Sequence, residues 1–465
     1  MEKLAQYFKL KENNTTVRTE LMAGLTTFMA TAFTILAIPG MIAGDDDRIR
    51  NAVFIAACLS AVFGTLLKAF YAKIPFVQAP GMGLGAYFSG SVMGGMALMA
   101  GADYLDRLTQ YQMALALVFI AGIFFTFSTL FGIRNAIINA IPKNIKLAMG
   151  AGIGLFITLL GLRFSGIVVG SPGTFVTMVN FRNAGLGMDI LEGRQAMGAI
   201  LAIVGVLVIT VLSIMKIKGA ILIGVIGTTL LNYLFGVVSL PDNFSFNLVS
   251  RFRDFFELSF LQMDFSFLNS NTAWGSMLAF ILAFVFVNML DALGTIYGIS
   301  VANGLVDEKG EVINLDKGLT ADAVGTVASG VLGTSTVTTV VSSASGISEG
   351  GRTGLTALTA AVLFALAILA APFVVLIPNV AVAPALIYVG FLMVSHVKEV
   401  DFKDPTEAFP AFLTVVIMPL TFSIANGIAF GLISYIVIKT CTGKIKEIKP
   451  LAVIIALMFV LQYIL

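Results

Sequence analysis

The stretch GTSTVTTVVSSASGISEGG, residues 333–351, interrupts a chain that otherwise consists largely of Leu, Ile, Val, Ala and Phe. Between Thr334 and Ser345, eight of the twelve residues carry a hydroxyl group and none carries a charge. Several of them are β-branched, which favours extended backbone over helix. The segment therefore predicts a break between the long apolar runs on either side of it.

The composition of the whole chain indicates its class. Of the 465 residues, 58% are hydrophobic and 12% are charged, whereas a soluble domain has about 25% charged residues. Apolar runs long enough to cross about 30 Å of hydrocarbon recur along the sequence. We therefore expect an all-α polytopic membrane protein in the lipid bilayer of the cell membrane.

Several other classes find little support. Cys58 and Cys441 are the two cysteines and suggest no disulfide framework. His396 is the single histidine, and there is no CxxC or HExxH motif, so we expect no metal site and no cofactor. We find no nucleophile–base constellation and no nucleic-acid motif, and we expect neither an enzyme nor a nucleic-acid partner. The polar first twenty residues indicate no cleaved secretory signal.

We expect about fourteen membrane passes in two sets of seven. The predicted spans are 21–43, 52–71, 74–93, 113–132, 145–168, 196–215, 218–238, 275–302, 319–333, 335–347, 354–378, 380–396, 408–424 and 425–440. A mixed loop is expected at 239–273, and residues 451–465 are either an oblique helix or an interfacial one. Lys and Arg concentrate in the loops that lie on the same side of the membrane as the N-terminus, which predicts a cytoplasmic N-terminus. An odd number of spans in each half makes the two halves inverted repeats.

The first half contains a matching break. FVQAPGMGLGAYFSG, residues 76–90, combines a proline that blocks a continuous helix with glycines that permit unusual backbone angles. Two interrupted spans at corresponding positions point to a substrate site in an inverted-repeat transporter. The alternative is that small residues merely allow close helix packing.

Polar residues near the two breaks are candidates for binding and coupling. Asn288, Asp291 and Thr295 share one helical face, and an acid inside an apolar span is a functional candidate unless it is a polar staple between helices. Asp322 either takes part in coupling or favours the start of its helix. The candidate substrate-binding residues are Gln78, Ala79, Gly83, Gly85, Asn288, Asp291, Thr336, Thr338, Thr339, Ser342 and Ser343, and the candidate ion-coupling residues are Asp291, Thr295 and Asp322.

The phrases QAPGMGLGAYFS, DALGT, ADAVGTVASGVLGTST and SEGGRTGLTA together resemble the nucleobase:cation symporter-2 superfamily, in its adenine/guanine/hypoxanthine permease branch. The resemblance implies a seven-plus-seven inverted repeat with two broken strand–helix spans. It also implies a core domain (1–135 and 275–378) that moves against a gate domain (136–274 and 379–465). The implied function is elevator-like, proton-coupled uptake of purine bases, often by homodimers.

Three positions depart from the pattern of that branch. Gly85 stands where the branch usually has asparagine, Asn288 where it has aspartate, and Ser342 where it has glutamate. Loss of two carboxylates removes hydrogen-bond acceptors for a neutral purine and removes negative charge. The changes favour an oxidised or acidic base such as xanthine or urate. A second hypothesis is an anion transporter on the same scaffold, which binds its ligand at the N-termini of the two half-helices.

Overall fold

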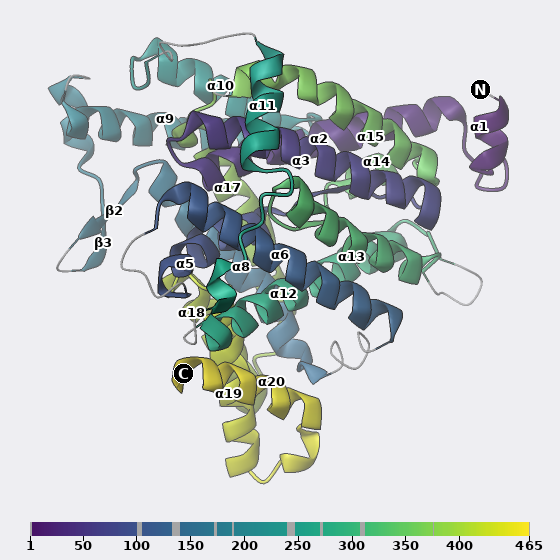
Figure 1. The fold of residues 1–465 in the computed structure, drawn as a ribbon, viewed down its shortest axis with the longest axis vertical. Coiled ribbons are helices and arrows are strands. Elements are labelled where there is room, and N and C mark those ends of the chain that lie inside the picture. The colour runs from purple at the N-terminus through teal and green to yellow at the C-terminus, as the bar shows by residue number, and fades with distance from the viewer. Residues whose placement is uncertain are drawn as a thin grey trace.

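A computed structural model shows a mostly helical chain whose long helices pack side by side (Figure 1). It describes residues 2–99, 105–132, 140–171, 174–187, 190–239, 247–269, 273–306, 312–374 and 376–464. The elements of the first half are α1 Glu2–Tyr7, α2 Val17–Ala43, α3 Asp47–Leu67, β1 Gln78–Pro80, α4 Met82–Tyr87, α5 Met93–Met99, α6 Arg107–Leu130, α8 Lys143–Phe164, β2 Val168–Ser171, β3 Phe175–Met178, α9 Leu191–Ile214, α10 Ala220–Leu234 and α11 Leu248–Leu258.

The second half repeats the sequence of long helices around a short strand. Its elements are α12 Ala273–Ala302, α13 Leu315–Leu332, β4 Val337–Thr339, α14 Ser343–Ser348, α15 Gly354–Ala367, α16 Ala371–Val374, α17 Asn379–Val394, α18 Pro405–Leu420, α19 Ile424–Cys441 and α20 Pro450–Ile464. Short π or 3-10 segments are η1 Lys68–Ala72, η2 Phe88–Val92, η3 Phe181–Leu186, η4 Ser266–Asn269, η5 Ile368–Ala370, η6 Ser395–Glu399 and η7 Ile445–Glu447.

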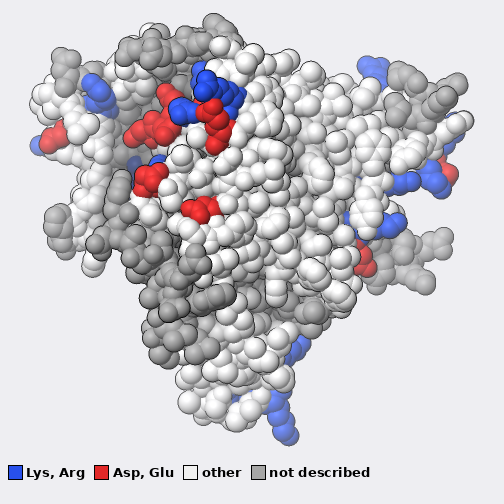
Figure 2. Space-filling model, in the orientation of Figure 1, with Lys and Arg blue, Asp and Glu red and all other residues white. Residues whose placement is uncertain are grey.

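Within the described residues, eight helices are long and apolar enough to cross a membrane, and four shorter apolar helices accompany them. The predicted helical membrane fold is therefore confirmed, while the count of fourteen spans stays a prediction. On the face shown in Figure 2, the described charged side chains gather in the upper left part, at the right and at the lower end, and the broad area between them is formed by uncharged residues. Such a surface suits contact with lipid.

The helices form two sets of close neighbours. In one set α2 and α3 pack against α15, and α13 packs between α3 and α6. In the other set α8 packs against α17 and α18, and α18 packs against α19. The C-terminal helix α20 contacts α12 and α19, so the predicted oblique packing of this segment has a partner in the bundle.

The prediction of a mixed loop at 239–273 was wrong for its middle part. Residues 248–258 form the helix α11. Asn247 caps the N-terminus of this helix, where its side chain accepts hydrogen bonds from the amides of Val249 and Ser250. Arg48, at the start of α3, pairs with Asp254 and Glu257 of α11 at 3.1 and 2.7 Å. The charged residues of this segment therefore form the polar side of a helix that packs against α3.

A buried acid joins α2 to α15. Glu20 is completely buried, and its carboxylate accepts hydrogen bonds from the backbone amides of Arg352, Thr353 and Thr356 and from both threonine hydroxyls. These amides belong to the N-terminal end of α15, where a negative charge is favourable. The segment SEGGRTGLTA thus binds the carboxylate of Glu20.

The turn that begins the second interrupted span requires glycine. Gly333 ends α13 with a φ of +98°, and a Cβ atom added there would overlap the side chain of Ser259. The Tyr111 hydroxyl donates to the Gly333 carbonyl at 2.5 Å and lies 2.7 Å from the Ser259 hydroxyl. The start of this span is therefore fixed to α6 and to the segment after α11.

We predict that Gly333→Ala lowers the free energy of unfolding by about 2–4 kcal/mol, because left-handed strain and overpacking add. Gly443 is a matched control, since its φ is +74° but no atom lies within 4 Å of an added Cβ. Gly443→Ala should cost only about 1–2 kcal/mol, the strain alone. Thermal unfolding of the purified variants measures both values, and equal losses would contradict the proposed close packing at Gly333.

Candidate functional site

The two interrupted spans meet through their strands. β1 runs antiparallel to β4, with Gln78 opposite Thr339, Ala79 opposite Thr338 and Pro80 opposite Val337. All six of these residues are buried. α4 follows β1 and α14 follows β4, so the two short helices begin at opposite ends of the strand pair. The predicted strand–helix breaks are therefore confirmed.

Hydrogen bonds beyond the paired residues extend the contact. The Gly81 amide donates to the Thr336 carbonyl at 3.3 Å, and the Val340 amide donates to the Val77 carbonyl at 3.1 Å. Pro80 has no amide hydrogen, so it leaves no donor to satisfy in the middle of the bundle. Backbone groups inside a membrane protein need such partners, and each broken span supplies them to the other.

The predicted residue Gln78 lies between two helices. Its backbone amide and carbonyl both bond to the Thr65 hydroxyl of α3, at 3.1 and 3.0 Å. Its carboxamide is completely buried, and a Cβ atom added to Gly64 of α3 or Gly325 of α13 would overlap it. Among the described residues its carboxamide atoms have no hydrogen-bond partner. Two glycines, one from each helix, therefore make room for this side chain.

Asp322 of α13 is completely buried and fully paired. Lys68, at the end of α3, donates to its carboxylate at 2.7 Å, and the Thr339 hydroxyl of β4 lies 2.9 Å from both carboxylate oxygens. The predicted coupling residue Asp322 and the predicted binding residue Thr339 are thus brought together. The Lys68 side chain is entirely inside the bundle.

Asn288 joins α12 to α13. Its amide group donates to the Thr326 hydroxyl at 2.6 Å, while Thr326 donates its own proton to the Asp322 carbonyl at 2.9 Å. The carbonyl oxygen of the Asn288 side chain is buried and has no partner among the described residues. An amide suits this position because Thr326 acts here as an acceptor.

Asp291 differs from Asp322 in its burial and in its partners. It is half-buried on α12, and no hydrogen bond or ion pair joins it to another described residue. Gly294 and Gly298, on the following turns, are exposed and face open space. Thr295 is buried one turn after Asp291. On the predicted polar face of α12, Asn288 and Thr295 are therefore buried, and Asp291 between them is half-buried.

The serines at the start of α14 have separate partners. The Ser342 hydroxyl lies 2.7 Å from the Thr31 hydroxyl of α2 and is half-buried. The Ser343 hydroxyl accepts from the Val77 amide at 3.1 Å and is completely buried. Thr336 and Thr338 are buried with no described partner for their hydroxyls. Thr31 was missed at the sequence level because its partner is 311 residues away.

The two predicted glycines of α4 lie at close contacts. A Cβ atom added to Gly83 would lie 2.5 Å from Ile153 of α8, and one added to Gly85 would overlap Ile38 of α2. Gly83 therefore marks where the first broken span touches α8. At Gly85, the volume that a larger side chain would take is filled by Ile38.

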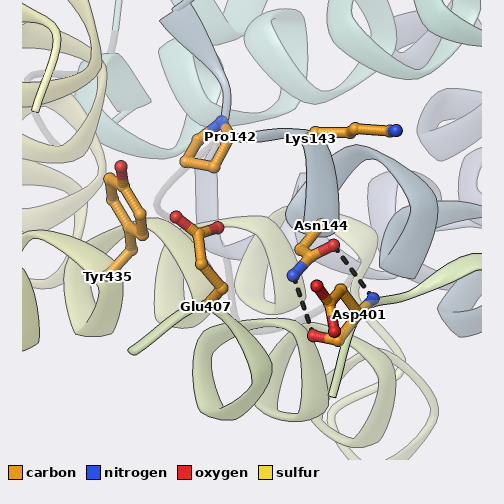
Figure 3. A pocket seen from close by; sticks show the side chains of 6 residues that line it. All are labelled: Pro142, Lys143, Asn144, Asp401, Glu407 and Tyr435. Atoms are coloured by element: carbon orange, nitrogen blue, oxygen red, sulfur yellow. Dashed lines mark hydrogen bonds between the residues drawn. The ribbon is translucent and has the colours of Figure 1, made fainter. Parts of the chain in front are cut away.

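A cavity of about 330 Å³ lies apart from the strand pair, between α8, α18 and α19 (Figure 3). Asn144 and the backbone of Asp401 exchange two hydrogen bonds along it, at 3.0 and 3.2 Å. Glu407 and Tyr435 complete its wall. No predicted site residue lines this cavity, so it is distinct from the strand-pair site.

Long apolar helices around two strand-paired, interrupted spans define a membrane permease. Residues 18–430 match the permease family, and the chain belongs to the nucleobase:cation symporter-2 family, which confirms the resemblance read from the sequence motifs. It is accordingly a multi-pass membrane transporter rather than an enzyme.

Several relatives match over nearly the full length, and two of them illustrate the likeness. The adenine permease AdeP of Escherichia coli (strain K12) is 35% identical and covers 99% of this chain and 96% of its own. The guanine/hypoxanthine permease PbuO of Bacillus subtilis (strain 168) is 36% identical and covers 98% and 99%. The transmembrane domain of the cyanobacterial bicarbonate transporter BicA superposes with a TM-score of 0.62 at 20% identity, over 88% of this chain and 97% of that one. This last likeness concerns the fold alone.

We predict that Gly85→Asn lowers the free energy of unfolding by about 1–3 kcal/mol through overpacking against Ile38. Ile38→Ala alone should cost about 2–5 kcal/mol by opening a cavity. The double variant should lose less than the sum of the two, because the new side chain occupies the vacated space. Chemical or thermal unfolding of the four proteins gives the comparison, and additive losses would show that Gly85 and Ile38 do not share this space.

Proposed function

We propose that this protein is a permease for purine-type nucleobases that carries its substrate together with a proton. Family membership and the names of the full-length relatives support a nucleobase as substrate. The strand pair supports this position of the site, since it joins buried, unwound backbone of both halves, and β4 contacts α12, the helix that carries Asp291. The proposal rests mainly on one observation, the antiparallel pairing of β1 with β4, which joins the two broken spans.

The chemistry of the site favours an oxidised or acidic base such as xanthine or urate. At the two positions where the family usually has carboxylates, Asn288 is bound to Thr326 and Ser342 is bound to Thr31. A serine hydroxyl both donates and accepts, so it suits a ring that carries carbonyl oxygens or a negative charge. The removal of two acids also reduces repulsion of an anionic base.

Asp291 is the residue that we assign to proton coupling. It is a half-buried acid beside the open part of α12 and has no described ion-pair partner. An unpaired acid inside a membrane span is well suited to exchange a proton. Asp322 is already satisfied by Lys68 and Thr339, and Thr295 adds a hydroxyl one turn beyond Asp291.

An elevator-like movement would carry the core domain (1–135 and 275–378) past the gate domain (136–274 and 379–465). The close helix pairs of the structure support this division, since α2, α3 and α15 belong to the first part and α8, α17 and α18 to the second. Lys218 pairs with Glu349 across the division at 2.8 Å. We also propose a cytoplasmic N-terminus and a homodimeric assembly.

A second candidate function is transport of a small anion. The neutral residues at 288 and 342 and the many hydroxyls around β4 favour it, because they place hydrogen-bond donors without adding negative charge. The two hypotheses differ in the ligand that stabilises the protein, and a direct binding comparison separates them.

We predict that xanthine or urate stabilises the purified protein more than adenine does, with guanine and hypoxanthine between them. A ligand at one hundred times its Kd adds about 2.7 kcal/mol to the stability of the folded state. Thermal unfolding with each base, and with bicarbonate and sulfate, measures the order. Stabilisation by a simple anion and by none of the bases would refute the nucleobase proposal and support the second candidate.

We predict that Asp291→Asn abolishes the stimulation of purine uptake by an inward proton gradient, because the amide cannot take up and release a proton. Proteoliposomes with and without a pH gradient measure this stimulation. Glu12→Gln is a suitable control, since Glu12 is exposed and pairs only with Lys9 among the described residues. Full gradient dependence in the Asp291→Asn protein would assign coupling to another group.

A further inference from the structure

Lys68 is a lysine with no exposed surface, close to the strand pair. Its ammonium group donates to the Asp322 carboxylate and to the Gly318 carbonyl, both at 2.7 Å. Both charged side chains are 0% exposed. A buried charge is costly unless it is paired and hydrogen-bonded, so each of these residues depends on the other.

The ion pair is one link in a continuous set of contacts that reaches the strands. Lys68 holds Asp322, and Asp322 accepts the hydroxyl of Thr339 at the end of β4. One turn earlier on α3, the Thr65 hydroxyl binds both backbone groups of Gln78. Thr65 and Lys68 are three residues apart and share a helix face. One face of α3 thus fixes both strands, β1 directly and β4 through Asp322.

We propose that Lys68 is a positioning residue for the substrate site, a role that rests on the proposed function. Its charge keeps Asp322 in place as an acceptor for Thr339, and Thr339 is the residue paired with Gln78 across the strands. The register of β1 against β4, and with it the start of α14 at Ser342, then depends on Lys68. Asp322 accordingly serves alignment, while Asp291 is left as the acid that is free of an ion pair.

A second buried lysine provides a comparison within the same chain. Lys439 of α19 is 1% exposed and pairs with Glu407 at 3.1 Å and with Glu447. Its described partners lie on α18 and on the segment before α20, away from β1 and β4. Loss of Lys439 should therefore disturb stability without changing the strand pair.

The experiment compares Lys68→Met, Asp322→Asn, the double variant and Thr339→Val with the control Lys439→Met. Radiolabelled purine uptake gives KM and the maximal rate, and thermal unfolding without substrate gives the melting temperature of each protein. We expect Lys68→Met and Asp322→Asn to raise KM at least about tenfold. Thr339→Val should raise KM with a smaller loss of melting temperature. Lys439→Met should lower the melting temperature and leave KM unchanged.

The double variant Lys68→Met with Asp322→Asn should melt at a higher temperature than Lys68→Met alone, because no uncompensated charge remains. A wild-type KM in Lys68→Met, with a fall in melting temperature like that of Lys439→Met, would overturn the positioning role. Additive losses of melting temperature in the double variant would overturn the ion pair itself. Absence of purine uptake by the wild-type protein would instead refute the proposed function, and the melting comparison would still test the pair.

Discussion

The pairing of β1 with β4 is the contact on which the rest of the structure depends. An unwound segment in the middle of a membrane protein exposes amide and carbonyl groups that lipid cannot satisfy. Here Gln78–Pro80 and Val337–Thr339 satisfy each other, although more than 250 residues separate them in the chain. The helices nearest to the strands supply the remaining partners, with Thr65 bound to Gln78 and Asp322 bound to Thr339.

Two acids on helices that contact β4 have different surroundings. Asp322 is enclosed by Lys68, Thr339 and the start of α13, and a carboxylate so fully bonded holds its neighbours in place. Asp291 lies where α12 becomes open and carries no described ion pair. We therefore propose that Asp322 is a fixed anchor and that Asp291 is the acid available for proton exchange.

The sequence was sufficient to predict the membrane class and the two breaks, because those features depend on local properties such as the proline at 80 and the hydroxyl-rich stretch at 334–345. It was insufficient for the partners of the site residues. Lys68 and Asp322 are 254 residues apart, and each looks like an isolated charge near a helix end. A charge inside an apolar run was the available signal, since it requires a partner.

The directions in which the site side chains point were also not predictable from the sequence. The carboxamide of Gln78, a predicted substrate-binding group, packs against Gly64 and Gly325. At Gly85, another predicted substrate-binding position, Ile38 fills the space that a larger side chain would take. Both outcomes arise from packing between helices that are distant in sequence, which residue type and spacing do not record. Ser342 is the altered position that stays half-buried and close to α2.

We propose that Ser342, in place of the glutamate usual in this branch of the family, gives the protein a preference for an oxidised or acidic base. Competition of unlabelled xanthine and adenine against radiolabelled guanine uptake in Ser342→Glu tests it most directly, with the exposed Ser348→Glu on the same short helix as control. We expect Ser342→Glu to shift the preference from xanthine toward adenine and Ser348→Glu to leave it unchanged. An unchanged order of competition in Ser342→Glu would contradict it.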